Sequence, residues 1–370
     1  MKTRFALFTC ALVVACETPP PVADGGLRDA ASRVDAGPIS APMCVALAVT
    51  PPSPSCEPAA TDYAPGADDM WEACVSDDGE YHRVQADISS VARIMAYEEV
   101  RSLLFDPSTD PSSETFLAAR LIYQRDEGLD SRVVRRYDPH YDVPEGTDCS
   151  LAGVPESFPD YCVGPAQIGP RILAAFASGI DGDVELPRVY AARIEASLLT
   201  FLAVSTYKES LTCTTSAKDC DSAYAYYTGG EEARGGLGLA AEVAAVDPLA
   251  HDRAWDGALA LRCWRDLDAA EVATDLALRD RARAQYDRAI TDGLAAVLRS
   301  RLVAACDAEG GALLYHWAFA RVLGTFLDRA VREQDPAAAD SLAGELSNTS
   351  PGDADITAAV AALDLTLTCP

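Results

Sequence analysis

The sequence predicts an all-α fold, a multi-helix bundle cross-linked by disulfides. Apolar residues recur three or four positions apart through segments such as 88–104 and 187–210, which is the spacing of one face of a helix. No segment shows the alternation of apolar and polar residues that strands require. Breakers such as Asp335-Pro336 and Pro351-Gly352 separate the helical segments. Spacing and breakers together therefore indicate helices joined by turns.

Each helix is placed by its own apolar row and its own breakers. Asp106-Pro107 ends the first helix, and Ser112 and Ser113 cap a second one. The segment 313–331 is apolar on most sides, which predicts the buried central helix. The irregular stretch 138–170 separates the first helices from the rest. The expected helices span 88–104, a segment with Phe116, Leu117, Leu121 and Ile122 on its apolar face, 187–210, 221–228, 231–246, 252–267, 270–305 and 313–331.

The segment from Cys213 to Gly230 carries the most distinctive residues of the chain. Asp219 to Ser222 predicts a helix N-cap, because Asp and Ser side chains accept hydrogen bonds from the free amides of a first turn. Gly229 and Gly230 suit the end of that helix, since glycine adopts a left-handed conformation at little cost. Cys213 and Cys220 could close a small loop over the end of the preceding helix.

Residues 1–15 have the form of a secretory signal, followed by a lipidation site. Two basic residues precede an apolar run from Phe5 to Val14, which is too short to span a bilayer. The small residue directly before Cys16 resembles the lipobox of bacterial lipoproteins. That resemblance implies that Cys16 is acylated and that buried methylenes hold the chain in a lipid bilayer. Glu17 in the next position implies the outer membrane, facing the periplasm or the cell surface.

A tether is predicted between the lipidated cysteine and the helical domain. Residues 16–65 are rich in Pro, Ala, Asp, Gly and Ser, and such a segment buries too little apolar surface to offset the entropy of ordering. Roughly 300 residues remain, which is enough for one large helical domain. We expect that domain over residues 66–370, where it could consist of two packed halves, 66–180 and 181–370.

The chain is strongly acidic. Its formal net charge is -27, and loss of Lys2 and Arg4 with the signal makes it two units more negative. Such a surface repels phosphate backbones, which excludes nucleic acid as a partner. It suits a cation or a basic partner, and it also favours solubility.

The 12 cysteines indicate disulfides rather than a metal cluster. Cys10 leaves with the signal and Cys16 carries lipid, which leaves ten in an exported chain that has no CxxC pair. Spacing does not determine connectivity, so any pairing is a hypothesis. Proximity suggests Cys213–Cys220, Cys149–Cys162 and Cys56–Cys74, with Cys263–Cys306 between helix ends and Cys44–Cys369 between the termini.

His316 stands out among the four histidines because it falls within an apolar helix. A histidine there is either a hydrogen-bonded core residue or a metal ligand completed by carboxylates from neighbouring helices. Tyrosines of the Cys213–Gly230 segment could supply a phenolate to ferric iron, or they could simply pack in the core. Glu195 and Glu232 are further acids that could approach His316. The metal ligands that we assign are His316, Glu209, Asp221, Glu231 and Tyr224.

Patterns of catalysis are weak in this sequence. The segment 236–241 fits a dinucleotide-binding fingerprint only in part, because no buried strand precedes it. No GxSxG motif and no Ser/His/Asp set stands out. The loop 138–170 could act as a lid, but no nucleophile and base can be named beside it. We therefore expect a protein that is not an enzyme.

Between Asp219 and Gly230 the chain resembles the low-iron-inducible periplasmic protein family, whose members assimilate iron. The family element D-x-A-(W/Y)-A-x-Y-x-G is matched by Asp221, Ala223, Tyr224, Ala225, Tyr227 and Gly229. The resemblance would cover residues 88–346, and it implies an exported helical protein linked to iron acquisition. We expect a lipid-anchored protein that binds or hands on a metal ion, iron first. The alternative is a structural or interaction module of the cell envelope.

Overall fold

Helices alone make up the regular structure of the described part of this chain, which confirms the all-α prediction. The computed structural model describes residues 40–44, 57–66, 70–125, 128–182, 187–230 and 234–367. Residues 39–370 form one unit. The predicted signal, Cys16 and the tether up to residue 39 lie outside the described residues, as do Cys56, Glu231, Glu232 and Cys369.

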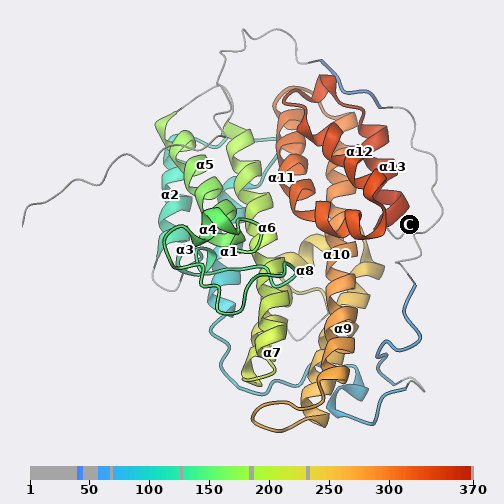
Figure 1. Ribbon diagram of the computed structural model, residues 1–370. Coiled ribbons are helices and arrows are strands. Elements are labelled where there is room, and N and C mark those ends of the chain that lie inside the picture. The colour runs from blue at the N-terminus through green and yellow to red at the C-terminus, as the bar shows by residue number, and fades with distance from the viewer. Residues whose placement is uncertain are drawn as a thin grey trace, which may run out of the picture. The chain divides into compact units, whose positions relative to one another are not determined.

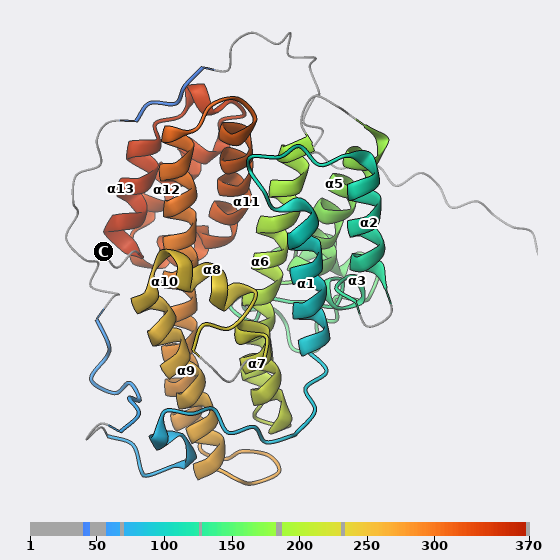
Figure 2. The same cartoon turned by 180° about the vertical axis from the view of Figure 1, so that it is seen from behind.

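Thirteen α-helices are present among the described residues, with three short turns of other helical type (Figures 1 and 2). They are η2 (Val75–Asp78), α1 (Val91–Leu104), α2 (Ser113–Gln124), α3 (Asp130–Val133), α4 (Val154–Ser157), η3 (Gly164–Ile168), α5 (Gly169–Asp181), α6 (Pro187–Thr212), α7 (Lys218–Thr228), α8 (Leu239–Val246), α9 (Pro248–Leu267), α10 (Leu276–Asp307), α11 (Gly310–Gln334), α12 (Pro336–Ser347), η4 (Pro351–Asp353) and α13 (Ile356–Thr366).

The buried central helix is α6. It begins at Pro187, which lacks an amide hydrogen and is therefore tolerated in a first turn. Helices α1, α5, α7 and α11 all pack against it, and nearly every residue between Ala191 and Thr206 is buried. Among the described helices α6 alone is long and apolar enough to cross a membrane, and 89% of its apolar window is buried in the fold, as in a core helix.

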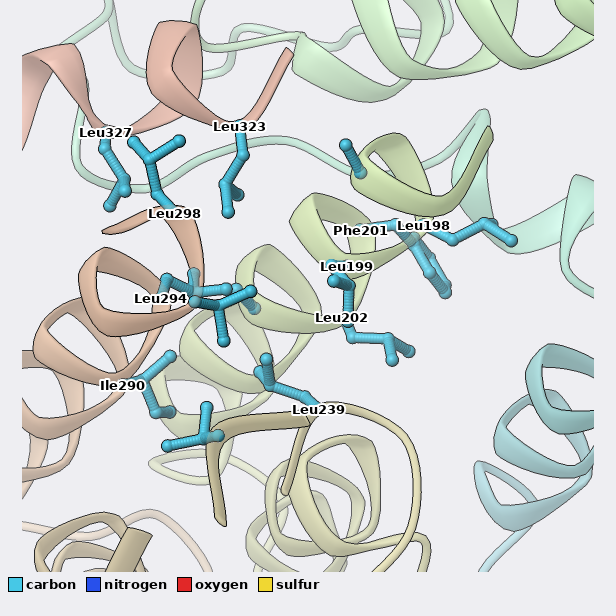
Figure 3. Packing of buried hydrophobic residues seen from close by; sticks show 14 of the residues in the cluster. Leu198, Leu199, Phe201, Leu202, Leu239, Ile290, Leu294, Leu298, Leu323 and Leu327 are labelled. Atoms are coloured by element: carbon cyan, nitrogen blue, oxygen red, sulfur yellow. The ribbon is translucent and has the colours of Figure 1, made fainter. Parts of the chain in front are cut away.

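The expectation that residues 313–331 form the central helix is wrong. Helix α11 buries one face against α6 and α10, but Thr325 on another face is exposed. Figure 3 shows how apolar side chains from four helices meet in the core. Its labelled residues come from α6 (Leu198, Leu199, Phe201, Leu202), α8 (Leu239), α10 (Ile290, Leu294, Leu298) and α11 (Leu323, Leu327), and all are at least 96% buried.

Glycine conformation explains why α8 starts later than residue 231. Gly235, Gly236 and Gly238 have φ values of 143°, 56° and 59°, which lie in the region that other residues rarely adopt. The described residues 234–238 are therefore a turn, and α8 begins at Leu239. The same property confirms the predicted end of α7, where Gly229 has a φ of 76°.

Two local predictions differ from the structure. Helix α7 already begins at Lys218, so Asp219 and Asp221 lie inside its first turns and neither side chain caps it. In α2 the buried face holds Phe116, Ala119 and Tyr123, whereas Leu117 and Leu121 are 48% and 64% exposed. Aromatic bulk, rather than the apolar row, decides which face of α2 turns inward.

Four disulfides join described cysteines. Cys149–Cys162 and Cys213–Cys220 are as predicted. Cys74 bonds to Cys263 and Cys44 bonds to Cys306, so the predicted pairs Cys56–Cys74, Cys263–Cys306 and Cys44–Cys369 are wrong. The long-range bonds follow the packing of the chain's start on α9 and α10, which proximity in sequence does not predict.

The segment 57–66, which we call the strap, belongs to the folded unit rather than to a tether. The backbone N–H of Tyr63 donates to Oε1 of Gln285 at 2.8 Å, and Nε2 of Gln285 donates to the Tyr63 carbonyl at 2.7 Å. Arg288 of α10 forms an ion pair with Asp62, and Arg281 donates to the Thr61 carbonyl at 2.9 Å. The strap is thus pinned along one face of α10.

Candidate functional site

The carboxylate of Glu209, assigned to a metal from the sequence, is held by arginine. It lies near the end of α6, where Nη1 of Arg136 donates to its Oε1 at 2.7 Å. Both side chains are largely buried, with 12% and 5% exposure. Arg136 also donates to the Tyr226 hydroxyl at 2.6 Å. A guanidinium in this position competes with a metal ion for the Glu209 carboxylate.

Asp221 binds backbone rather than an ion. Its carboxylate accepts hydrogen bonds from the amides of Val84 and Gln85 at 3.1 and 2.8 Å and from the Tyr81 hydroxyl at 3.2 Å. Tyr224 stacks on Tyr81 with ring centroids 3.8 Å apart. The acid and the tyrosine of the family-like element thus fasten the segment before α1 to α7.

His316 lies in a different part of the fold from Glu209 and Asp221. The neighbouring Tyr315 donates its hydroxyl hydrogen to Glu195, which precedes Glu209 by 14 residues in α6, about 21 Å along a helix. Burial and the nearby charge of Arg301 lower the pKa of His316 to about 4. Its Nδ1 has no hydrogen-bond partner among the described residues. The adjacent cation makes this imidazole a poor metal site.

The predicted metal ligands therefore do not come together. Glu209, Asp221 and His316 belong to three separate clusters, Tyr224 shares the cluster of Asp221, and Glu231 lies outside the described residues. Within the described ranges no group of three or more His, Cys, Asp or Glu residues is placed to hold a metal ion. The iron centre drawn from the sequence does not fit this arrangement.

Glu195, which the sequence analysis considered, joins five helices through a buried charge network. Its carboxylate accepts from Tyr315 and from Nη2 of Arg301 at 2.6 Å. Arg301 in turn lies 3.7 Å from Glu242, which pairs with Arg101 at 2.8 Å. Burial raises the pKa of Glu195 to about 7 against the opposing charge of Arg301. The network links α1, α6, α8, α10 and α11 and has a structural role.

His140 is clamped between two carboxylates. Its Nδ1 lies 2.5 Å from Oδ1 of Asp138, and its Nε2 lies 3.0 Å from Oδ2 of Asp287 on α10. The ring stacks on Tyr207 with centroids 3.7 Å apart. Burial alone would lower the pKa of His140, but its hydrogen bonds to the two acids outweigh burial and raise it to about 9. The charged imidazolium thus fastens the irregular segment between α3 and α4 to α10.

Replacing His140 with glutamine is expected to lower the free energy of unfolding by about 3 kcal/mol at pH 6, at about 1.4 kcal/mol per pKa unit. A raised histidine pKa contributes stability that is complete below the unfolded pKa of 6.5 and is lost as the pH rises through 9. Urea unfolding at pH 6 and pH 10 measures this, with the exposed His82→Gln as control. An equal loss at both pH values would assign the effect to packing on Tyr207 instead.

A cavity of about 240 Å³ lies between the strap, α9 and α10. Its walls are formed by the strap residues Glu57, Pro58, Ala59, Asp62, Tyr63 and Ala64 and, from the two helices, by Arg253, Asp256, Gln285, Arg288, Ala289 and Asp292. Gly257, next to Asp256, lets α9 and α10 approach closely, because a Cβ there would lie 2.6 Å from the Cα of Tyr286. The helix pair and the strap together therefore build a cavity with both charged and apolar walls that neither forms alone.

Asp292 is the unusual residue of this cavity. It is 3% exposed, and its Oδ1 has no hydrogen-bond partner among the described residues. Two of the other lining acids are neutralised: Asp62 by Arg288, and Asp256 by Arg234 at 2.8 Å. Burial raises the pKa of Asp292 to about 8, although Arg288 and Arg253 act against the rise. A buried carboxyl without a partner is costly, which singles out this position.

Sequence reasoning missed Asp292, although a signal exists. Gln285, Ala289 and Asp292 are spaced as i, i+4 and i+7 and so share one face of α10. Asp292 continues this face and lies beside the apolar residues Ile290 and Leu294 in the sequence. This position indicates that its carboxyl is buried. What could not be foreseen is the strap, which contacts Gln285 across 222 residues of sequence.

Comparison of the chain with protein-family models, with curated proteins and with solved structures found no match. The class of protein is therefore defined by fold and site alone. It is an all-α protein braced by disulfides, with a charged cavity between its strap and a helix pair.

Proposed function

We propose that this chain is a non-catalytic binding protein of the cell envelope that captures a small cation in the cavity beneath the strap. Lipid on Cys16 would hold it at the outer membrane, and the acidic surface would draw cations toward it. The observation that carries the proposal is the carboxyl of Asp292, which is 97% buried at a cavity of about 240 Å³ and whose Oδ1 has no hydrogen-bond partner among the described residues.

Charge at the cavity supports a cation over an anion. Four acids line it, Glu57, Asp62, Asp256 and Asp292, against two arginines, Arg253 and Arg288. A ligand that carries positive charge would pair with the ionised form of Asp292, whereas an anion would be repelled by the acids of the lining. Binding a cation here is therefore coupled to ionisation of Asp292.

The first test is a titration of the full lipidated chain, purified from the envelope in mild detergent. Iron is the first titrant, because the family-like element at Asp221 suggests it, and calcium and a small alkylammonium ion follow. We expect saturable heat with at least one of these cations, and an affinity at least about tenfold weaker in Asp292→Asn, since a charge-assisted contact contributes roughly 1.5–3 kcal/mol.

The control is Asp280→Asn, which removes an exposed carboxylate from the same helix. It should bind as the unaltered chain does. Cation binding that Asp292→Asn leaves intact would place the site elsewhere, and absence of heat with every cation would contradict capture. In that case the acidic surface favours the second candidate, a module that binds a basic partner in the envelope.

A further inference from the structure

The cavity also indicates the chemical class of its ligand, and this inference rests on the proposed function. We infer that the ligand is a small organic ammonium ion that binds the carboxylate of Asp292 and lays its aliphatic part against the strap. Its size follows from the volume: a cavity of about 150 Å³ holds benzene. By proportion the space here, about 240 Å³, accepts roughly ten non-hydrogen atoms.

The polar walls distinguish an ammonium from a metal ion. A hard cation such as Ca²⁺ takes six to eight oxygen ligands, and Mg²⁺ takes six. Here Asp62 and Asp256 are already bound by Arg288 and Arg234, and Glu57 is exposed, so Asp292 is the one buried lining carboxyl that a metal ion would find uncommitted. An ammonium group needs fewer contacts, because one charge-assisted hydrogen bond to Asp292 leaves donors for nearby acceptors.

The remaining walls suit an alkyl chain. Pro58, Ala59, Ala64 and Ala289 present small apolar side chains to the same cavity. Tyr63, 2% exposed, adds an aromatic ring, which attracts a cation over its face as well as apolar groups at its edge. A molecule with one charged end and a short hydrocarbon body therefore matches both halves of the site, whereas a bare ion matches only one.

Binding of such a ligand requires the ionised form of Asp292. Because burial raises the pKa of this carboxyl to about 8 in the ligand-free protein, an ammonium ion that binds near pH 7 displaces a proton into the buffer. The charged groups that act on the carboxyl from the neighbouring elements are Arg288 and Asp287 of α10, Arg253 of α9, and Asp247 at the start of α9. Two further groups complete the surroundings: the ion pair between Asp62 of the strap and Arg288, and the side chain of Asp256 on α9.

The experiment is calorimetry of the full chain at pH 7 with four probes that each contain five carbon atoms: pentylammonium, pentane-1,5-diammonium, pentan-1-ol and pentanoate. Each titration is repeated in buffers of different ionisation enthalpy, which reports the protons released. We expect pentylammonium to bind at least about tenfold more tightly than pentan-1-ol and to release about one proton per ligand. The diammonium tests whether another acid that lines the cavity binds a second ammonium group.

Two variants keep the result interpretable. Asp292→Asn should lose both the preference for ammonium and the proton release while remaining folded, because asparagine replaces the protonated acid at equal volume. Ala289→Leu fills the cavity and should weaken every probe. Tight binding of pentan-1-ol or pentanoate, or proton uptake, would overturn the ammonium assignment. If the chain binds iron but no ammonium ion, the ligand class is wrong, although cation capture still holds. If the chain binds neither, cation capture itself is wrong.

Discussion

Replacing Asp292 with asparagine is expected to stabilise the ligand-free protein by roughly 4 kcal/mol at pH 7, at about 1.4 kcal/mol per pKa unit. The folded chain keeps a proton on this carboxyl up to a pKa of about 8, whereas the unfolded chain releases it near 3.8. Between these values the unfolded state binds fewer protons, so the contribution of Asp292 to the free energy of unfolding falls as the pH rises. Asparagine removes that contribution.

Urea unfolding from pH 4 to pH 8 measures the effect. The difference between variant and unaltered chain should be small at pH 4 and should grow with each pH unit, while Asp280→Asn stays flat. Glu195 also has a raised pKa, but it is present in both chains and cancels in the comparison. A constant difference across this range would show that packing, rather than protonation, separates the two chains.

Removing the Cys74–Cys263 bond, by serine at both positions, is expected to lower the free energy of unfolding by about 5 kcal/mol, against about 2 kcal/mol for Cys213–Cys220. The two bonds span 189 and 7 residues. A longer loop loses more conformational freedom in the unfolded chain when it is closed, so opening it costs more stability.

Unfolding of each double-serine chain under non-reducing conditions tests this ranking. The Cys149–Cys162 bond, which spans 13 residues, serves as an intermediate member of the series and should resemble the short loop. Equal losses for the long and short loops would mean that the bonds act on the folded state. In that case the Cys74–Cys263 bond would stabilise the folded position of the segment that follows the strap.

The fold class and most helices could be predicted because they depend on local spacing. The apolar row of α6 and the glycine at the end of α7 are properties of neighbouring residues, and both predictions are confirmed. The two disulfides between cysteines close in sequence are confirmed for the same reason. Cys44 and Cys74 bond to helices more than 180 residues away, and no local pattern encodes that packing.

The candidate site could not be predicted, because its distinguishing property is the lack of a partner. Asp221 and Glu209 looked like ligands in the sequence, yet backbone amides and Arg136 satisfy them. Asp292 looked like an ordinary acid in a long helix, yet its Oδ1 has no hydrogen-bond partner in the described part of the chain. Whether a carboxylate has a partner depends on which distant segments fold over it, and that is decided by tertiary packing.

The attachment of the chain's start to its last helices sets how the folded unit bears mechanical load. Cys44 is bonded to Cys306 at the end of α10, and Met43 exchanges backbone hydrogen bonds with Ala354 and Ile356 at 3.0 and 3.1 Å. A pull on the chain before Ser40 therefore meets a covalent bond to one of the longest helices. Helices α1 and α2 come later in the chain, so such a pull reaches the Cys44–Cys306 bond before it reaches them.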